Sequence, residues 1–224
     1  MRYIKKEKTL PQLTIWIAVN RTLPNFNYKS LPSSVRNEIK NTLLQEQGYI
    51  CAYTGLKIVT ERSHIEHMIT QENCRRSSRP ELTVDYRNVV ACFPGNKAPE
   101  PPFGARYKGD WPLLQEEEHL LLKPTDPSCE SRIKYLVDGR VEAMNSNDDV
   151  AKTTIEKLNL SEASLANRRK EAIVNLFSST YGRKPTRQSL RNRLQNLDAR
   201  NDGELEEFCF AKKQCLERKI SSWQ

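Results

Sequence analysis

Apolar residues recur at helical spacing in the first quarter of the chain. Between residues 31 and 47 they fall on one helical face, at Val35, Ile39, Leu43 and Leu44. Gly48 follows and suits the left-handed residue that ends many helices. The pattern predicts a helix that starts near 31–34 and ends at Gln47. A shorter apolar run, 13–19, predicts a buried segment of helix or strand.

Short strand-like runs occupy the middle of the chain. Residues 49–59 predict a β-hairpin around Thr54-Gly55. Residues 133–144 predict another around Asp138-Gly139, a dipeptide favoured in tight hairpin turns. Residues 85–92 predict a further strand that ends in four apolar residues.

The last third of the chain has a helical pattern. Ser161 is placed to cap a helix whose apolar stripe leaves the basic run 168–170 mostly outside. Two more helices are predicted, around 190–197 and 205–220.

These patterns together predict an α+β protein built from three segments. Residues 1–48 form a basic, helical flank, 49–145 a core of short strands with a hairpin extension, and 146–224 a helical lobe. Within the core, the proline-rich stretch 94–102 excludes regular structure. A short helix is expected over 103–110.

The charge of the chain narrows the classes of function. A formal net charge of +8 favours a polyanionic partner, because lysine and arginine release counterions from phosphates. No apolar run reaches the ~20 residues of a membrane span, and the first residues do not resemble a secretory signal. We therefore expect a cytoplasmic protein. Six cysteines without a CxxC pair predict neither disulfides nor a structural zinc site.

The tetrapeptide His64-Ile65-Glu66-His67 is the richest in candidate chemistry. It follows a Cys51-x-x-Thr54-Gly55 turn and precedes the strand that contains Asn88. A carboxylate beside a histidine can hold a divalent metal and deprotonate a water, the two operations that phosphodiester hydrolysis needs. A histidine on a half-buried strand is by itself more often a core residue. The order of the flanking pieces favours the functional interpretation of Glu66 and His67.

That order (hairpin, Glu-His strand, loop, Asn-Val-Val strand, lysine-containing turn) resembles a ββα-metal (HNH) nuclease. The chain resembles in particular the retron- and Septu-associated HNH endonucleases, the PtuB-like nuclease subunits of anti-phage defence systems. The resemblance rests on motifs at 43–53, 64–67, 85–88, 108–110, 122–124, 135–140 and 158–168. It implies a ββα-metal core that cuts nucleic acid with the help of a metal ion.

The resemblance assigns roles to four residues. Glu66 takes the position of the acidic metal ligand, for Mg²⁺ or Mn²⁺, and His67 that of the general base. Asn88 takes the position of the middle asparagine, which ties the loop together or orients the histidine, and a structural role is favoured. His64 matches an additional family histidine that contacts phosphate or supports the base. An ordinary core histidine is an equal alternative for His64.

The chain departs from the family pattern at the last metal ligand. No histidine or asparagine directly precedes the Lys108-Gly109 pair. Asp110 or Asn96 is the expected substitute. Alternatively, Arg106 or Lys108 contacts phosphate and the metal keeps more of its water.

Basic residues near the motif and near the C-terminus are candidates for contact with the substrate backbone. Each stretch could equally be an ordinary solvated surface. The candidates are Arg75, Arg76, Arg79, Arg106, Lys108, Arg183, Lys184 and Arg187.

The resemblance also implies partners. These are a nucleic-acid substrate (DNA or tRNA-like RNA), an ABC/SMC-like ATPase subunit and, in retrons, a reverse transcriptase with its RNA–DNA hybrid. The nuclease would be the effector, or toxin, of the system. Two alternatives stay open. One is a nucleic-acid-binding subunit that does not cut, which the missing last ligand favours, and the other is an interaction scaffold.

Overall fold

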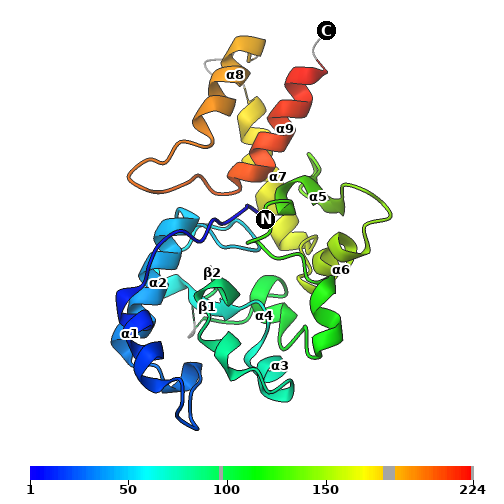
Figure 1. Ribbon diagram of the computed structural model, residues 1–224. Coiled ribbons are helices and arrows are strands. Elements are labelled where there is room, and N and C mark those ends of the chain that lie inside the picture. The colour runs from blue at the N-terminus through cyan, green and yellow to red at the C-terminus, as the bar shows by residue number, and fades with distance from the viewer. Residues whose placement is uncertain (96–97, 179–184, 223–224) are drawn as a thin grey trace.

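Helices lie around a small antiparallel sheet near the middle of the molecule (Figure 1), and a second two-stranded antiparallel sheet forms later in the chain. The structure is a computed structural model that describes residues 1–95, 98–178 and 185–222. The strands are β1 (His64–His67), β2 (Val89–Cys92), β3 (Ile133–Tyr135) and β4 (Val141–Ala143). The α-helices are α1 (Pro11–Asn20), α2 (Ser33–Gln47), α3 (Gln71–Arg76), α4 (Gly104–Lys108), α5 (Cys129–Arg132), α6 (Asp149–Lys157), α7 (Ala163–Phe177), α8 (Arg187–Asn196) and α9 (Cys209–Ser221). The predicted α+β class is confirmed.

Short 3₁₀ segments connect these elements. They are η1 (Tyr28–Ser30), η2 (Thr60–Arg62), η3 (Pro80–Thr83), η4 (Tyr86–Asn88) and η5 (Gln115–Leu120). Among the described helices, none has the length and apolar character needed to cross a bilayer.

The two N-terminal helices match the sequence pattern to different degrees. α2 is confirmed, with its apolar stripe buried and Gly48 in the left-handed conformation (φ 62°). α1 is helical, but the expected burial of its apolar run is confirmed only in part, because Trp16 and Ile17 pack against the core at intermediate exposure. Leu13 is buried, whereas the side chains of Ile15 and Val19 lie on the outer face and are 65% and 70% exposed.

β1 and β2 pair in antiparallel register, with His67 opposite Val89. The strand predicted over 85–92 is therefore extended only from Val89 onward. Its first part forms η4, because the Asp85 carboxylate accepts a hydrogen bond from the Arg87 N–H and turns the chain.

The hairpin predicted over 49–59 forms only in part. Ile50 and Lys57 make a single β-bridge around the turn. Beyond that bridge the first arm turns toward β2, where the Ala52 N–H donates to the Ala91 carbonyl at 3.2 Å. Pairing with β2 thus competes with pairing inside the hairpin.

α7 departs from its prediction in two ways. Its N-terminus is capped by the Glu162 carboxylate, while the Ser161 hydroxyl accepts the Val141 N–H of β4 at 3.1 Å. Arg169, expected mostly outside the apolar stripe, is buried at 1% exposure. Its guanidinium donates to the Gly139 carbonyl at 2.5 Å, so it ties α7 to the β3–β4 turn.

The main hydrophobic core draws on all three predicted segments. It includes Leu43 of α2, Val90 of β2 and Phe208 just before α9. A smaller cluster of Leu190, Leu197 and Leu216 joins α8 to α9. The division of the chain at 48 and 145 stays a prediction.

The hairpin predicted over 133–144 is confirmed, and its turn packs directly on α7. Gly139 has a φ of 85°, and a Cβ there would lie 1.9 Å from the Ala166 carbonyl oxygen. We expect Gly139→Ala to cost about 3 kcal/mol or more, because strain in the left-handed backbone adds to the clash.

Gly203→Ala is the matched control for that change. Gly203 has a φ of 84°, but nothing lies within 4 Å of its would-be Cβ. The backbone strain alone should cost about 1 kcal/mol. Chemical denaturation measures both variants, and equal losses would contradict the close packing of the turn on α7.

Candidate active site

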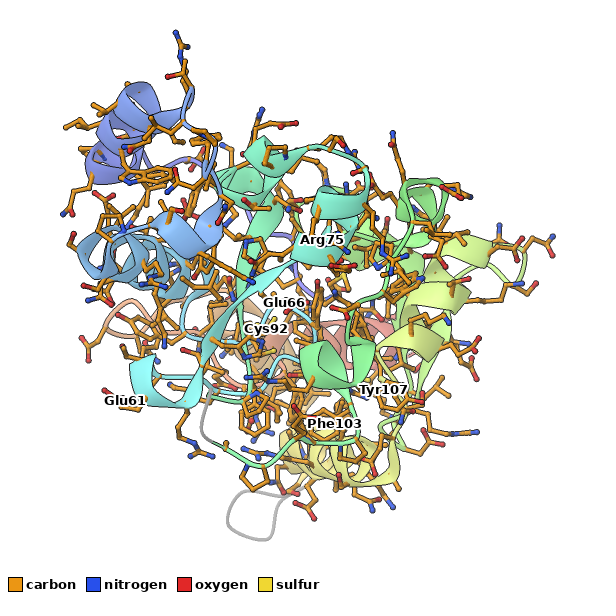
Figure 2. The ribbon with its side chains drawn as sticks, turned by 90° about the horizontal axis from the view of Figure 1, so that it is seen from below. Glu61, Glu66, Arg75, Cys92, Phe103 and Tyr107 are labelled. Carbon is orange, nitrogen blue, oxygen red and sulfur yellow. The ribbon has the colours of Figure 1, made fainter. Side chains whose placement is uncertain are left out.

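The polar residues of β1 form one wall of a cleft. The hollow has a volume of about 450 Å³. In Figure 2, Glu66 lies between α3, which carries Arg75, and α4, which carries Tyr107. The residues that line the hollow are His64, Ile65, Glu66, His67, Thr70, Gln71, Glu100, Ala105, Arg106, Gly109 and Asp110. The structure thus brings together five of the predicted site residues: His64, Glu66, His67, Arg106 and Asp110.

His67 is held with one nitrogen unprotonated. Its Nε2 lies 2.9 Å from the carbonyl oxygen of Thr83, which can only accept, so Nε2 carries the proton. Nδ1 keeps its lone pair and lies 3.5 Å from the amide nitrogen of Gln71. Burial lowers the pKa of His67, which favours the neutral ring at pH 7. The ring can therefore accept a proton at Nδ1.

Glu66 faces a buried ammonium group. Its Oε1 lies 2.8 Å from Nζ of Lys108, whose side chain is 0% exposed. Burial alone would raise the pKa of the Glu66 carboxyl, but Lys108 and His64 outweigh it and hold the pKa below its ordinary value. The carboxylate is therefore ionised at neutral pH.

Lys108 is placed differently from its prediction. We expected it to contact a substrate phosphate, but it lies in the interior. Its ammonium donates to the Trp111 carbonyl at 2.7 Å and pairs with Glu66. The ammonium also donates to the His67 carbonyl at 3.4 Å, so the lysine side chain links α4 to β1.

His64 lies beside the same carboxylate. Its Nδ1 is 2.5 Å from the Pro94 carbonyl oxygen and must donate to it, because a carbonyl only accepts. Nε2 is thereby directed toward Glu66 Oε2, 3.6 Å away. His64 and Glu66 thus present a nitrogen and an oxygen close together at the cleft.

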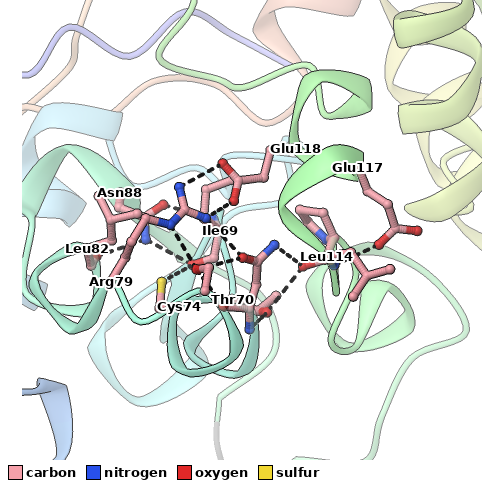
Figure 3. A network of polar contacts seen from close by, with 12 residues as sticks. Ile69, Thr70, Cys74, Arg79, Leu82, Asn88, Leu114, Glu117 and Glu118 are labelled. Atoms are coloured by element: carbon pink, nitrogen blue, oxygen red, sulfur yellow. Dashed lines mark hydrogen bonds and ion pairs between the residues drawn. The ribbon is translucent and has the colours of Figure 1, made fainter.

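Asn88 ties the loop after β1 to the segment before β2. Its Oδ1 accepts the Ile69 N–H at 2.8 Å, and its Nδ2 donates to the carbonyls of Ile69 at 2.9 Å and Leu82 at 3.0 Å (Figure 3). Leu82 directly precedes Thr83, whose carbonyl holds His67. Asn88 therefore positions the histidine through the backbone, in line with the structural role that the sequence favoured.

Acidic residues pair with the arginines that follow β1. The segment predicted as a polar loop begins as α3, where Arg75 and Arg76 both pair with Glu72. Arg79 pairs with Glu118 within the network of Figure 3. The pair with Glu118 gives Arg79 a structural role in the fold. Contact between the three arginines and nucleic acid stays a prediction.

Of the remaining predicted residues, three are not described and one lies away from the cleft. Asn96, Arg183 and Lys184 lie outside the described residues. Arg187 begins α8, which lies near the top of Figure 1, and it does not line the cleft.

Two neighbours of His67 escaped prediction. Gln71 follows His67 by four residues but begins α3, so its approach to the histidine depends on the path of residues 68–70 between strand and helix. Tyr28 packs the edge of its ring against the imidazole, with centroids 4.7 Å apart. No local pattern indicated that contact, because η1 reaches β1 only through tertiary folding.

The cleft is lined by carboxylates and imidazoles, the side-chain types that bind divalent cations. Apart from its ion pair with Lys108, Glu66 Oε1 is buried and has no hydrogen-bond partner in the described part of the chain. Glu100 and Asp110 add carboxylates to the lining. Among the described residues, no three Asp, Glu, His or Cys side chains gather into a complete metal cage. Mg²⁺ commonly binds one or two carboxylates and several waters, so this set suits magnesium better than zinc.

Two cysteines that are far apart in the sequence meet at the end of β2, whose last residue is Cys92. Cys51 and Cys92 are both buried, and the Phe93 N–H donates to Cys51 Sγ at 3.4 Å. Burial alone would raise the pKa of the Cys51 thiol, but hydrogen bonds with Cys92 and Thr54 lower it to about 5. Thr54 thus forms a hydrogen bond with the Cys51 thiol. The expected lack of a structural zinc stays a prediction.

Comparison with known proteins gives one informative similarity. No family model matches the chain. A protein of Vibrio cholerae serotype O1 biovar El Tor, named "Retron Vc95 putative HNH endonuclease", is 26% identical to the chain over 164 residues. The similarity covers 71% of this chain and 75% of that protein. It supports a distant relation to retron-associated HNH nucleases, whereas the likeness to PtuB-like subunits stays a prediction.

Proposed function

We propose that the protein is a metal-dependent HNH-type endonuclease that hydrolyses phosphodiester bonds of nucleic acid. The supporting observation is that an unprotonated His67 Nδ1 and an ionised Glu66 belong to one cleft. The name of the V. cholerae relative supports the same class. β1, β2 and α4 would form the ββα-metal core.

In the proposed reaction, His67 acts as the general base, and other side chains of the cleft would hold the cation. His67 Nδ1 accepts a proton from the attacking water, while Nε2–H stays anchored on Thr83 and fixes the ring. Glu66 and His64 would hold Mg²⁺ or Mn²⁺, with Asp110 in place of the missing last ligand. When bound, the cation supplies Lewis-acid stabilisation of the phosphate and the leaving oxygen. Arg106 lines the same cleft and would contact a phosphate.

We propose further that this nuclease is the effector of a cytoplasmic anti-phage defence system. Its partners would be an ABC/SMC-like ATPase and, where a retron is present, a reverse transcriptase with its RNA–DNA hybrid. The motif resemblance and the retron name of the V. cholerae relative support this assignment.

Nucleic-acid binding without cutting is the second candidate function. The lack of a three-ligand group among the described residues favours it. Calorimetric titration with Mg²⁺ and Mn²⁺ separates the two functions. The nuclease should bind the metal and lose most of that affinity in Glu66→Ala. No metal affinity in either protein supports the binding-only function.

Cleavage tests the proposal directly. The purified protein, with its partner subunits, should cut DNA or RNA in the presence of Mg²⁺ or Mn²⁺, and EDTA should stop the reaction. His119→Ala is a control, because His119 is exposed and does not line the cleft. If neither DNA nor RNA is cut with either metal, the nuclease function is wrong.

A further inference from the structure

A second cleft lies on the α2 side of β1. It has a volume of about 430 Å³ and is lined by Tyr28, Ser33, Arg36, Asn37, Lys40, His64 and Ile65. His64 and Ile65 also line the candidate active cleft. The two hollows therefore adjoin along β1. A chain-like ligand that crosses Ile65 would reach both.

The two hollows differ in charge. Glu66, Glu100 and Asp110 line the active cleft, where they outnumber the cationic Arg106. The described lining of the second cleft includes no acidic residue, and its cationic side chains are Arg36 and Lys40. A phosphate is therefore attracted to the second cleft without help from a metal, whereas the carboxylates of the first would repel it.

α2 places Arg36 and Lys40 on one face, one helical turn apart. The Lys40 ammonium donates to the Ser63 carbonyl at 2.8 Å, which holds it next to the start of β1. Arg36 is exposed and forms no ion pair with any residue that the structure describes. Glu61 influences Lys40 electrostatically, but it lies in η2, outside the lining. Both cations are thus available at the cleft.

We propose that this second cleft binds the sugar-phosphate backbone of the substrate strand, next to the bond that is cut. Arg36 and Lys40 pair with one phosphate, and the adjoining phosphate enters the active cleft. Asn37 and Tyr28 supply neutral hydrogen bonds of the kind that hold phosphates and sugars. This inference rests on the proposed function. It adds a site on α2, outside the strands and short helix of the nuclease core.

Binding in the absence of cutting tests the inference. A His67→Ala protein in EDTA is titrated with labelled single-stranded DNA, duplex DNA and an RNA stem-loop, and fluorescence anisotropy is recorded over a range of salt concentrations. Adding Arg36→Ala/Lys40→Ala should weaken binding about tenfold at low salt and reduce the salt slope by about 1, because the neutralisation of one phosphate is lost. If the double variant loses affinity for only one of the three probes, the cleft binds that type of nucleic acid.

Two matched variants control for charge and for folding. Lys157→Ala/Lys170→Ala removes the same charge from exposed positions on α6 and α7 and should keep nearly the full salt slope. Arg36→Lys/Lys40→Arg keeps the charge at the cleft and should retain binding, while thermal melting checks the fold of all variants.

The inference is overturned if the Arg36→Ala/Lys40→Ala protein binds every probe as the Lys157/Lys170 control does. It is also overturned if the His67→Ala protein binds none of the probes. Failure of the proposed function gives a different result. In that case the original protein does not cut, while its binding to nucleic acid still depends on Arg36 and Lys40.

Discussion

His67→Ala should lower the rate of metal-dependent cleavage by about 10²–10⁴-fold, the usual contribution of a positioned general base. The variant loses the unprotonated Nδ1 that the Thr83 carbonyl orients. His64 cannot replace it, because its own Nδ1 is bonded to Pro94 and its Nε2 is directed at Glu66. Single-turnover rates at saturating protein measure the chemical step without the contribution of substrate binding.

Two measurements separate loss of the base from loss of the fold. Added imidazole should restore part of the rate of His67→Ala, since truncation leaves a ring-sized space beside Thr83. The His119→Ala control should cut at the original rate. A His67→Ala protein that keeps its fold and cuts as fast as the original would refute the assigned role.

Elements that bury one apolar face, or that turn at a short characteristic motif, could be predicted from the local sequence pattern. The stripe of α2 and the turn of the 133–144 hairpin depend on residues close together in the sequence, and both predictions are confirmed. The burial of α1 could not be predicted in this way. Ile15 and Val19 are exposed because nothing described packs on that face, and a local pattern does not contain that information. Arg169 shows the opposite case. It is a charged residue that is buried, because its guanidinium donates to the Gly139 carbonyl in the β3–β4 turn.

The candidate site could be predicted where its residues are adjacent in the sequence. Glu66 and His67 follow each other on one strand, so the sequence already places their backbones side by side. Their side chains leave opposite faces of the strand, so only the tertiary structure shows that both line one cleft. The burial of Lys108 could not be predicted from the sequence. Its charge indicated contact with a phosphate, whereas in the structure the side chain is buried beside Glu66. Arg36 and Lys40 lie on a helix outside the motif, and only the tertiary structure places them next to His64.

Lys108→Met should destabilise the fold by about 3 kcal/mol at neutral pH, because it leaves a largely buried carboxylate without its cation. Methionine fills a similar volume, so the loss reflects charge rather than a cavity. The Glu66 side chain is 15% exposed, and His64 is its remaining partner. Urea denaturation in EDTA measures the free energy of unfolding without any contribution from bound metal.

The effect of Lys108→Met should depend on pH in a defined direction. In the original protein the Glu66 pKa lies below its ordinary value, so its ionisation stabilises the fold above the unfolded pKa of ~4.3. That stability is lost as the pH falls through the folded pKa. Without Lys108, burial becomes the dominant influence and raises the pKa of Glu66 above the unfolded value. The contribution then reverses sign, and ionisation above pH ~4.3 favours the unfolded chain.

The loss of stability in Lys108→Met should therefore grow between pH 4 and pH 7, in contrast to a loss of packing, which would be the same at both. Glu66→Gln in the Lys108→Met background removes the unpaired charge and should recover much of the loss, and the double-mutant cycle isolates the pairwise energy. Lys157→Met on α6 removes an exposed lysine and should change stability by less than about 0.5 kcal/mol. If the Lys108→Met loss is independent of pH and Glu66→Gln recovers none of it, the ion pair does not hold α4 against β1. The ionised state of Glu66 would then need another cause.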